Sequence, residues 1–416
     1  MSNGIREAFR QNEVLTILCV QILILMTGLG IVSPVLPLYA RSFGVSITMV
    51  GLLITAFGLA RLPLNIPAGH FCERFGRRWL LIAGPAVVAL TSLGSGLATS
   101  FWQLLAFRIF QGAGGALHAT AATIALADIS QPANRGRTIS LFQGSLMLGA
   151  GLGPVLGGVT AEHFGYRAPF FCYAFLAAIA TIWAYLRIPE TRQAQPAILQ
   201  PGDGPGTKAS RPSSGMRPFL VNPNFILVVL VTIGIIFTRA GAQSAILPLF
   251  ADRHLGLSAG QIGLALSLVA AMNLATLFLA GALSDRLGRK AVIIPGSLLT
   301  GLSLVMFAKS GNLLLFLASA ALLGVGTGVA GPAPAAYAID LASPMDYGAV
   351  LALYRTVTDL GFVAGPVLLG WIGDLYGLSA SLLVNAALVL ATGFLFVLAR
   401  ETVRQPGKGV SPVAVG

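Results

Sequence analysis

The chain has 416 residues, of which 56% are hydrophobic and 10% are charged. A soluble chain of this length would need far more charge to cover its surface, so the composition excludes a water-soluble protein. The net charge of +12 does not indicate nucleic-acid binding, because the basic residues lie in short segments between apolar runs, without interleaved aromatic residues.

Twelve apolar runs are long enough to cross a hydrocarbon core of ~30 Å, which takes about 20 helical residues. No cleavable signal peptide is expected, because the first run is too long and lacks a small-residue cleavage site. In chain order the predicted helices span residues 14–40, 46–70, 79–99, 102–127, 137–161, 168–187, 224–250, 258–283, 291–309, 313–339, 348–373 and 378–400.

A polar stretch rich in Pro and Gly separates the first six runs from the last six. Such a composition cannot build a core and is typical of a flexible linker. The predicted organisation is an N-terminal six-helix bundle over 1–189, a cytoplasmic linker over 190–221, a C-terminal six-helix bundle over 222–403 and a cytoplasmic tail over 404–416.

The basic residues predict the orientation, because Lys and Arg are enriched in cytoplasmic loops. With a cytoplasmic N-terminus, 18 of the 26 Lys and Arg fall on the cytoplasmic side, four fall on the other side and four lie inside helices. We therefore expect a multi-pass protein of the inner (plasma) membrane with both termini in the cytoplasm.

The two sets of six runs repeat each other. Residues 69–78 (GHFCERFGRR) return as residues 281–290 (GALSDRLGRK), at an offset of 212 residues. Many transporters place a central site between duplicated hydrophobic halves. The repeat thus predicts an all-α membrane protein of two pseudo-symmetric six-helix bundles.

The repeated loop predicts a cytoplasmic gate. Its glycines allow a tight turn, and its acid, Glu73 or Asp285, lies near the hydrocarbon boundary, where an unpaired charge is costly. An arginine of the loop or the positive end of a neighbouring helix could neutralise that acid. The alternative is a static topology anchor. The predicted gate residues are Gly69, Glu73, Arg74, Gly76, Arg77 and Asp128, with Gly281, Asp285, Arg286, Gly288, Arg289 and Asp340 in the second half.

Four motifs carry a resemblance to a known family. The loop pattern G-x-x-x-[DE]-R-x-G-R-[RK] resembles the signature of the major facilitator superfamily, and residues 108–115 (RIFQGAGG) resemble its R-x-x-Q-G motif. Residues 149–158 (GAGLGPVLGG) are similar to the G-x-x-x-G-P-x-x-G-G motif of antiporters. Pro34 and Pro37 are similar to the paired prolines of the twelve-helix drug/proton antiporter family. The resemblance covers essentially the whole chain and departs at Glu73, where the family usually has Asp.

The antiporter-like motif also has a physical meaning of its own. Small residues four apart let helix backbones approach closely, and a proline inside a helix permits a bend. The two compatible interpretations are packing alone and a hinge. The residues concerned are Gly149, Gly153, Pro154, Gly157 and Gly158, with Gly361, Gly365 and Pro366 in the second half.

Buried ions in the spans predict where protons move. Arg355 and Asp359 are four residues apart and share one helix face. They form either a self-neutralising pair or a proton carrier, Asp359, whose partner can be withdrawn. The resemblance implies a coupling role for Arg108. His118 is either a relay or, as we favour, a neutral packing residue.

Further polar residues in the spans are candidates for a substrate cavity. The deep charges are four Arg and one Asp, which favours an anionic, zwitterionic or neutral amphiphilic substrate over a cation. The candidate cavity residues are Arg61, Asn65, Arg239, Gln243, Asn273, Gln111, Gln143 and Tyr39.

Taken with the resemblance, these patterns predict a monomeric, proton-coupled antiporter that exports small hydrophobic or amphiphilic compounds by alternating access. The alternatives are a sugar or organic-acid facilitator or symporter and a lipid flippase on the same fold. No metal-ligand cluster, nucleotide motif or nucleophile–base arrangement stands out, so we expect no cofactor, no metal and no enzyme activity. Cys19, Cys72 and Cys172 are interpreted as small buried apolar residues.

Overall fold

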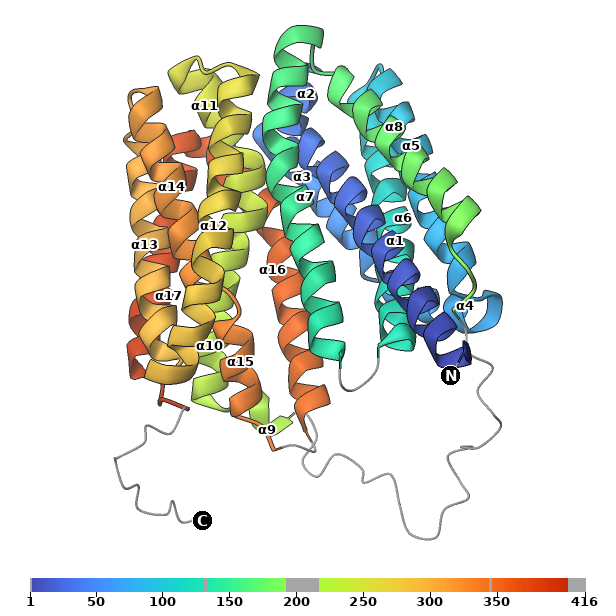
Figure 1. The fold of residues 1–416 in the computed structure, drawn as a ribbon. Helices are drawn as coiled ribbons and strands as arrows, with labels where there is room; N and C mark the ends of the chain where they lie inside the picture. Colours follow the sequence, from blue (N-terminus) through green and yellow to red (C-terminus); the bar gives the residue numbers. More distant parts are fainter. Residues whose placement is uncertain (1, 131–133, 192–216, 344–345, 403–416) are drawn as a thin grey trace, which may run out of the picture.

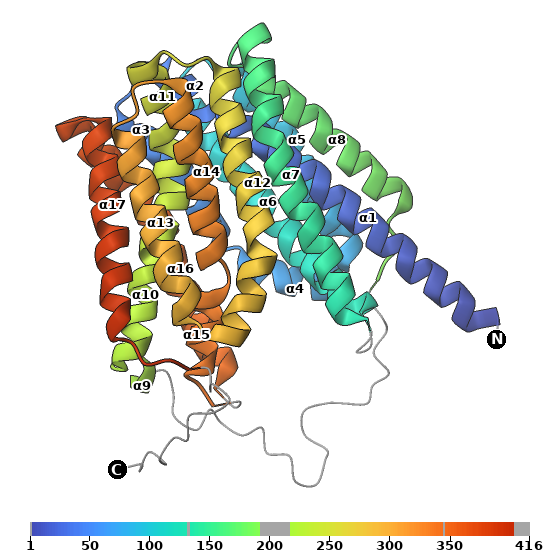
Figure 2. The same cartoon turned by 60° about the vertical axis from the view of Figure 1, so that its left-hand side comes forward.

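The computed structural model describes residues 2–130, 134–191, 217–343 and 346–402, and its elements are helical throughout these ranges. Two helical bundles lie side by side (Figures 1 and 2). The first contains α1 (Ser2–Val32), α2 (Leu36–Arg41), α3 (Ile47–Arg61), α4 (Asn65–Phe75), α5 (Arg77–Leu97), α6 (Phe101–Ile129), α7 (Arg135–Phe164) and α8 (Ala168–Arg187). The second contains α9 (Arg217–Leu220), α10 (Pro223–Ile236), the π-helical η1 (Phe237–Ile246), α11 (Leu247–Leu255), α12 (Ala259–Leu287), α13 (Lys290–Ala308), α14 (Leu313–Ala330), α15 (Ala333–Asp340), α16 (Tyr347–Tyr376), α17 (Leu378–Leu395) and the short 3-10 turn η2 (Phe396–Leu398).

Three of the predicted spans are broken where the sequence carries a proline. The first span breaks at Pro34, the second at Pro63 between α3 and α4, and the tenth at Pro332 between α14 and α15. Proline lacks the backbone N–H that a continuing helix needs and clashes with the preceding turn. In the described ranges ten helical spans are long and apolar enough to cross a membrane, and the shorter α3 and α6, which carries Arg108, Gln111 and His118, complete twelve.

The predicted linker and tail lie largely outside the described residues, which omit 192–216 and 403–416. Within the range predicted as linker, Glu190 makes helix-capping contacts and α9 is a short helix. The described residues therefore extend into both edges of that range.

The duplication is visible in the backbone. Helices α7 and α16 begin and end at positions exactly one repeat apart in number, 135–164 and 347–376. Glycines with positive φ end corresponding elements in both halves, and they form the pairs Gly44 and Gly256, Gly76 and Gly288, and Gly165 and Gly377. The predicted pseudo-symmetry of the two halves is confirmed.

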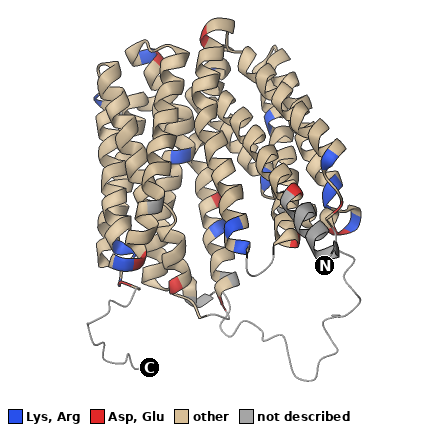
Figure 3. Ribbon diagram, in the orientation of Figure 1, with Lys and Arg blue, Asp and Glu red and all other residues tan. Residues whose placement is uncertain are grey.

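Charge marks one end of the bundle. Figure 3 shows blue Lys and Arg segments gathered mainly at one end of the bundle, with fewer inside the helical body. We call this end, which carries the turns at Gly76 and Gly288, the basic end. The end that carries the turns at Gly165 and Gly377 is called the far end. Which end faces the cytoplasm stays a prediction.

Two helix pairs, α7 with α12 and α3 with α16, make most of the contacts between the halves, and α2 with α11 and α3 with η1 add smaller ones. The backbones of the two main pairs touch, because a Cβ atom placed on Gly263 would lie 2.2 Å from the Pro154 carbonyl oxygen. On the other side of the molecule, a Cβ atom on Gly51 would lie 2.2 Å from the Pro366 carbonyl oxygen. Larger side chains at these glycines would push the halves apart.

The antiporter-like glycines pack α7 onto α1 within the first half. A Cβ atom on Gly149 would lie 2.5 Å from the Leu23 carbonyl oxygen, and one on Gly157 would lie 1.8 Å from the Ile31 carbonyl oxygen. Gly158 instead faces α12, where a Cβ atom would lie 2.3 Å from the Ala259 carbonyl oxygen. One motif thus serves two interfaces, while bending at Pro154 stays a prediction.

These contacts predict that Gly157→Ala destabilises the protein. Its added methyl must displace the α1 backbone, and such overpacking costs about 1–3 kcal/mol. Gly144, on the same helix, has no atom within 4 Å of the added methyl, so Gly144→Ala is the matched control. We expect Gly157→Ala alone to lower the melting temperature in detergent micelles; an equal effect of both variants would contradict the packing argument.

Candidate functional site

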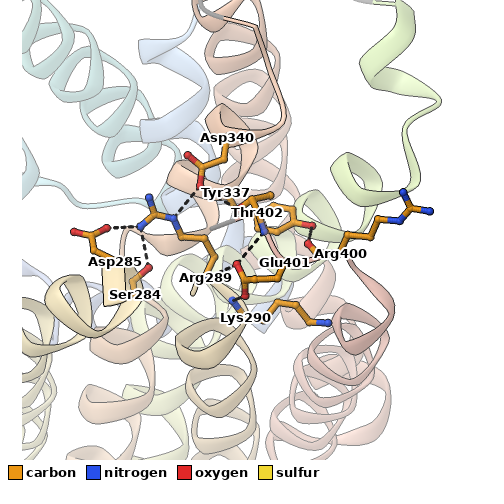
Figure 4. Close-up of polar contacts among 9 residues, drawn as sticks. All are labelled: Ser284, Asp285, Arg289, Lys290, Tyr337, Asp340, Arg400, Glu401 and Thr402. Carbon is orange, nitrogen blue, oxygen red and sulfur yellow. Dashed lines mark hydrogen bonds and ion pairs between the residues drawn. The ribbon is translucent and has the colours of Figure 1, made fainter. Parts of the chain in front are cut away.

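The loop at the basic end of the second half holds an acid–base–acid cluster (Figure 4). Arg289 donates from Nη1 to Asp285 Oδ1 at 2.6 Å and to Ser284 Oγ at 3.0 Å, and from Nε to Asp340 Oδ2 at 3.0 Å. Burial lowers the pKa of the Arg289 guanidinium, but the hydrogen bonds to Asp340 and Asp285 outweigh burial and raise the pKa. The cluster is therefore strongly ionic and lies within one half.

The first half forms a smaller version of this cluster. Arg77 donates from Nε to Asp128 Oδ2 at 2.8 Å and from Nη1 to the Cys72 carbonyl oxygen at 3.3 Å. Among the described residues Arg77 forms no ion pair with Glu73, whose side chain is exposed. The predicted three-member cluster is thus present at Arg289 and reduced to two members at Arg77.

Two glutamates that the sequence reasoning missed complete these loops. Glu190 accepts hydrogen bonds from the backbone N–H groups of Arg77 (2.9 Å) and Arg78 (3.2 Å). Glu401 does the same for Arg289 (2.9 Å) and Lys290 (3.0 Å). Each carboxylate caps the N-terminus of the following helix, where the backbone dipoles favour negative charge.

A signal for these glutamates exists in the sequence. Each is followed by a threonine, Thr191 or Thr402, whose hydroxyl donates to the aspartate of the same cluster, at 3.5 Å and 3.1 Å respectively. The Glu-Thr pair recurs at an offset of 211 residues, one fewer than the main repeat. A search at the fixed offset of 212 therefore passes over it.

The far end holds the two halves together through acids that cap helices of the opposite half. Asp374 of α16 accepts hydrogen bonds from the backbone N–H groups of Ile47 and Thr48, both at 2.8 Å, and from the Thr48 hydroxyl at 2.6 Å. Glu162 of α7 accepts from the N–H of Gly260 at 3.2 Å. Glu162 and Asp374 are repeat partners, so the two contacts are crossed and symmetric.

More hydrogen bonds continue this seam toward the middle of the bundle. The Thr55 hydroxyl donates to the Val363 carbonyl oxygen at 2.5 Å, and the N–H of Val155 donates to Ser267 Oγ at 3.0 Å. Contacts between the halves therefore run from the far end inward.

In the middle of the bundle Arg61 of α3 and Asp359 of α16 line one pocket of about 140 Å³ between the halves, together with Phe362. The two charges attract each other, and the electrostatic effect of Arg61 on Asp359 exceeds that of Arg355. Asp359 and Arg355 are both exposed, and in the described chain Asp359 forms no ion pair with Arg355 or with Arg61. The acid thus lies within the electrostatic reach of one arginine on its own helix and one in the opposite half, and its role stays a prediction.

The polar stripe on α6 is buried within the first half. Arg108 is 4% exposed, donates to Gln111 and lies with its guanidinium carbon 4.6 Å from the Phe57 ring centre. Gln111 in turn donates to Ser92 Oγ at 2.7 Å. His118 is buried, and its Nε2 has no hydrogen-bond partner among the described residues. These side chains are removed from the space between the halves.

The predicted cavity residues separate into several environments. Tyr39 is buried and donates to the backbone carbonyl oxygens of Ser95 and Ala98, which makes it a packing residue of the first half. Gln143 is exposed and Gln243 is half-buried. Asn65 begins α4, but its side chain lies outside the described residues.

Arg239 and Asn273 are brought together in the second half. The hydrogen-bond network assigns the Asn273 amide oxygen to the side that faces Arg239. In this orientation the oxygen accepts from Arg239 Nη2 at 3.3 Å and from the N–H of Gly328 at 3.0 Å. Arg239 itself is exposed. In the described ranges no group of three or more His, Cys, Asp or Glu side chains could hold a metal ion.

Comparison with known proteins agrees with this geometry. Residues 18–239 and 229–414 match the family model described as Major Facilitator Superfamily. The chain is 27% identical to Multidrug resistance protein 2 of Bacillus subtilis, covering 88% of this chain and 90% of that protein. It is 28% identical to Multidrug resistance protein MdtG of Enterobacter lignolyticus, covering 87% and 86%.

A solved structure shares the fold. It is a bacterial homologue of the human lysosomal transporter Spinster, in an inward-facing and occupied conformation. The TM-score is 0.78 at 17% sequence identity, and the match covers 93% of this chain and 96% of that one.

The crossed contacts at the far end predict that Asp374→Ala combined with Glu162→Ala opens that end. Losing a helix cap costs about 1–2 kcal/mol, enough to shift a two-state equilibrium several-fold for each acid. Spin labels at Trp102→Cys and Leu314→Cys, in a background without the three native cysteines, report the separation. Both sites are repeat partners at the far end and are 65% and 79% exposed.

We expect the double variant to lengthen the distance between the labels. Asp252→Ala removes another acid near the far end and should leave the distance distribution unchanged. An unaltered distribution in the double variant would show that the crossed caps do not hold the halves together.

Proposed function

Because the chain belongs to the major facilitator superfamily, we propose that it is a proton-coupled antiporter that exports small hydrophobic or amphiphilic compounds across the plasma membrane. The observation that carries the proposal is the position of Asp359 between the halves, opposite Arg61. The drug-resistance names of the relatives support the choice of an efflux substrate.

The proposed coupling depends on a partner that moves. An opposite charge nearby favours the ionised form of a carboxyl group, and loss of that charge in a poorly solvated site favours the protonated form. Arg61 and Asp359 belong to different halves, so any rocking motion changes their separation. The protonation of Asp359 then depends on the conformation, which is the requirement for coupling proton movement to alternating access.

The contacts at the two ends of the bundle are consistent with alternating access. Hydrogen bonds between the halves gather toward the far end, while the repeat partners Gln143 and Arg355, nearer the basic end of α7 and α16, are exposed. With the basic end in the cytoplasm, as the positive charges predict, this arrangement corresponds to an inward-facing state. The clusters at Arg77 and Arg289 would then engage the opposite half when the basic end closes.

The driving force is adequate for export. Each proton that enters along a membrane potential releases about 2.3 kcal/mol per 100 mV, before any pH gradient is added. A lipid flippase would need lateral gaps between α7 and α12 or between α3 and α16. Toward the far end these pairs instead touch at Gly263 and Gly51, which favours the exporter.

The proposal predicts that Asp359→Asn abolishes proton-coupled flux but retains exchange of substrate. The purified protein is reconstituted into proteoliposomes that contain a pH-sensitive dye. A pH gradient is imposed, and fluorescent amphiphiles that are anionic, neutral or cationic are added. We expect amphiphile-dependent proton movement to fall about tenfold or more in Asp359→Asn, because asparagine cannot carry a proton. Exchange without a gradient should remain.

Asp252→Asn is the matched control, an aspartate near the far end that should leave both activities intact. Full proton-coupled flux in Asp359→Asn would refute the proposed carrier. Arg61→Gln should uncouple flux as well, since it removes the partner that distinguishes the two conformations.

A further inference from the structure

We propose that Arg239 binds the anionic headgroup of the substrate, and that the substrate class is therefore an amphiphilic organic anion. The inference rests on the proposed transport function and names the substrate of the same central region. It begins from one cation in the second half that lacks a compensating acid.

The side chain of Arg239 keeps accessible surface although protein atoms surround it closely, as expected for a residue beside an internal space. The residue lies on η1, a π-helical stretch inside an otherwise α-helical span, and such widened turns occur often at functional sites. The Ser244 hydroxyl donates to the Arg239 carbonyl oxygen at 2.9 Å, across one wide turn of this helix. The side chain is exposed although it lies deep in a membrane span.

The polar neighbours of Arg239 orient it without neutralising it. The Asn273 amide oxygen accepts from Arg239 Nη2 and is itself held by Gly328 and Thr327. A guanidinium has five N–H donors, so most of them stay available to a ligand. A neutral amide fixes the direction of the guanidinium and leaves its charge uncompensated.

Among the described residues no acid forms an ion pair with Arg239. The ion pairs among the described residues join Arg77 and Arg289 to acids at the basic end. The deep acid Asp359 interacts electrostatically with Arg61 and Arg355. An arginine at the centre of a membrane costs at least ~2.5–3.5 kcal/mol, so an exposed and uncompensated one indicates a functional site.

The repeat shows that this charge is specific to one half. The repeat partner of Asn273 is Arg61, and the repeat partner of Arg239 is Thr27. Among the described residues Arg61 shares a pocket with a carboxylate, that of Asp359, whereas Arg239 forms no ion pair with an acid. The arrangement separates two tasks: the proton goes to Asp359, and a carboxylate or sulfonate of the substrate goes to Arg239.

The test compares three probes that share a pyrene body and differ in headgroup charge: 1-pyrenebutyrate, its neutral primary amide and a trimethylammonium analogue. Binding to the full chain in nanodiscs is measured by fluorescence, without a pH gradient. We expect wild type to bind the carboxylate about tenfold or more tightly than the amide, which is ~1.4 kcal/mol. The cation should bind more weakly than the amide.

Two variants locate the preference. Arg239→Gln should lower the carboxylate affinity to that of the amide and leave amide binding unchanged. Asn273→Asp keeps the side-chain shape, adds an acid beside Arg239 and should abolish the preference even if Arg239→Gln folds poorly. Arg253→Gln, at the C-terminal end of α11, is the control and should keep the full preference.

An unchanged carboxylate preference in both variants would overturn the proposal, as would a parallel loss for acid and amide or a wild-type preference for the cation. Failure of the proposed function gives a different pattern. In that case Asp359→Asn would keep its proton-coupled flux, while Arg239-dependent binding in the absence of a gradient would persist.

Discussion

An ion that leaves water needs a partner, and this constraint accounts for the placement of charged side chains throughout the bundle. At the basic end Arg77 and Arg289 pair with aspartates of their own halves. Glu190 and Glu401 accept hydrogen bonds from backbone N–H groups at helix N-termini of their own halves. At the far end Asp374 accepts such a bond from a helix N-terminus of the other half. Whether a charge finds its partner within one half or across the boundary decides whether it strengthens a bundle or joins two.

The difference between contacts within one half and contacts across the boundary supports the proposed motion of the two halves. Bundles that are held internally by ionic clusters and by glycine packing can move as units, whereas helix caps between halves can exchange for water when one end opens. Caps of this kind are hydrogen bonds to charged groups, strong enough to favour one state and weak enough to be released. Asp359 and Arg61 also belong to different halves and line one pocket, so a motion of the halves would change their separation.

Duplication explains the symmetry of the structure, and departures from it locate the chemistry. The turn glycines, the helix caps and the pairing of an arginine with an aspartate match in both halves because both must fold and close in the same way. Arg61 against Asn273, and Thr27 against Arg239, do not match. A central site that distinguished its ligands by charge could not be built from identical halves related by symmetry, since each charge would then be repeated.

By itself the sequence determined what depends on composition and on neighbours along the chain: the twelve spans, the repeat, the basic end, and the breaks that proline makes possible. These are local properties, because a helix needs only its own residues to satisfy its backbone in a membrane. Tertiary structure decided which residues meet. Asp359, expected to pair within α16, lines one pocket with Arg61 of the other half, whose position differs by about 300 residues. Tyr39 is buried in the core, and Glu190 and Glu401 cap helix N-termini. The partner of a polar group depends on which helices pack together, and this packing follows from the arrangement of the two halves.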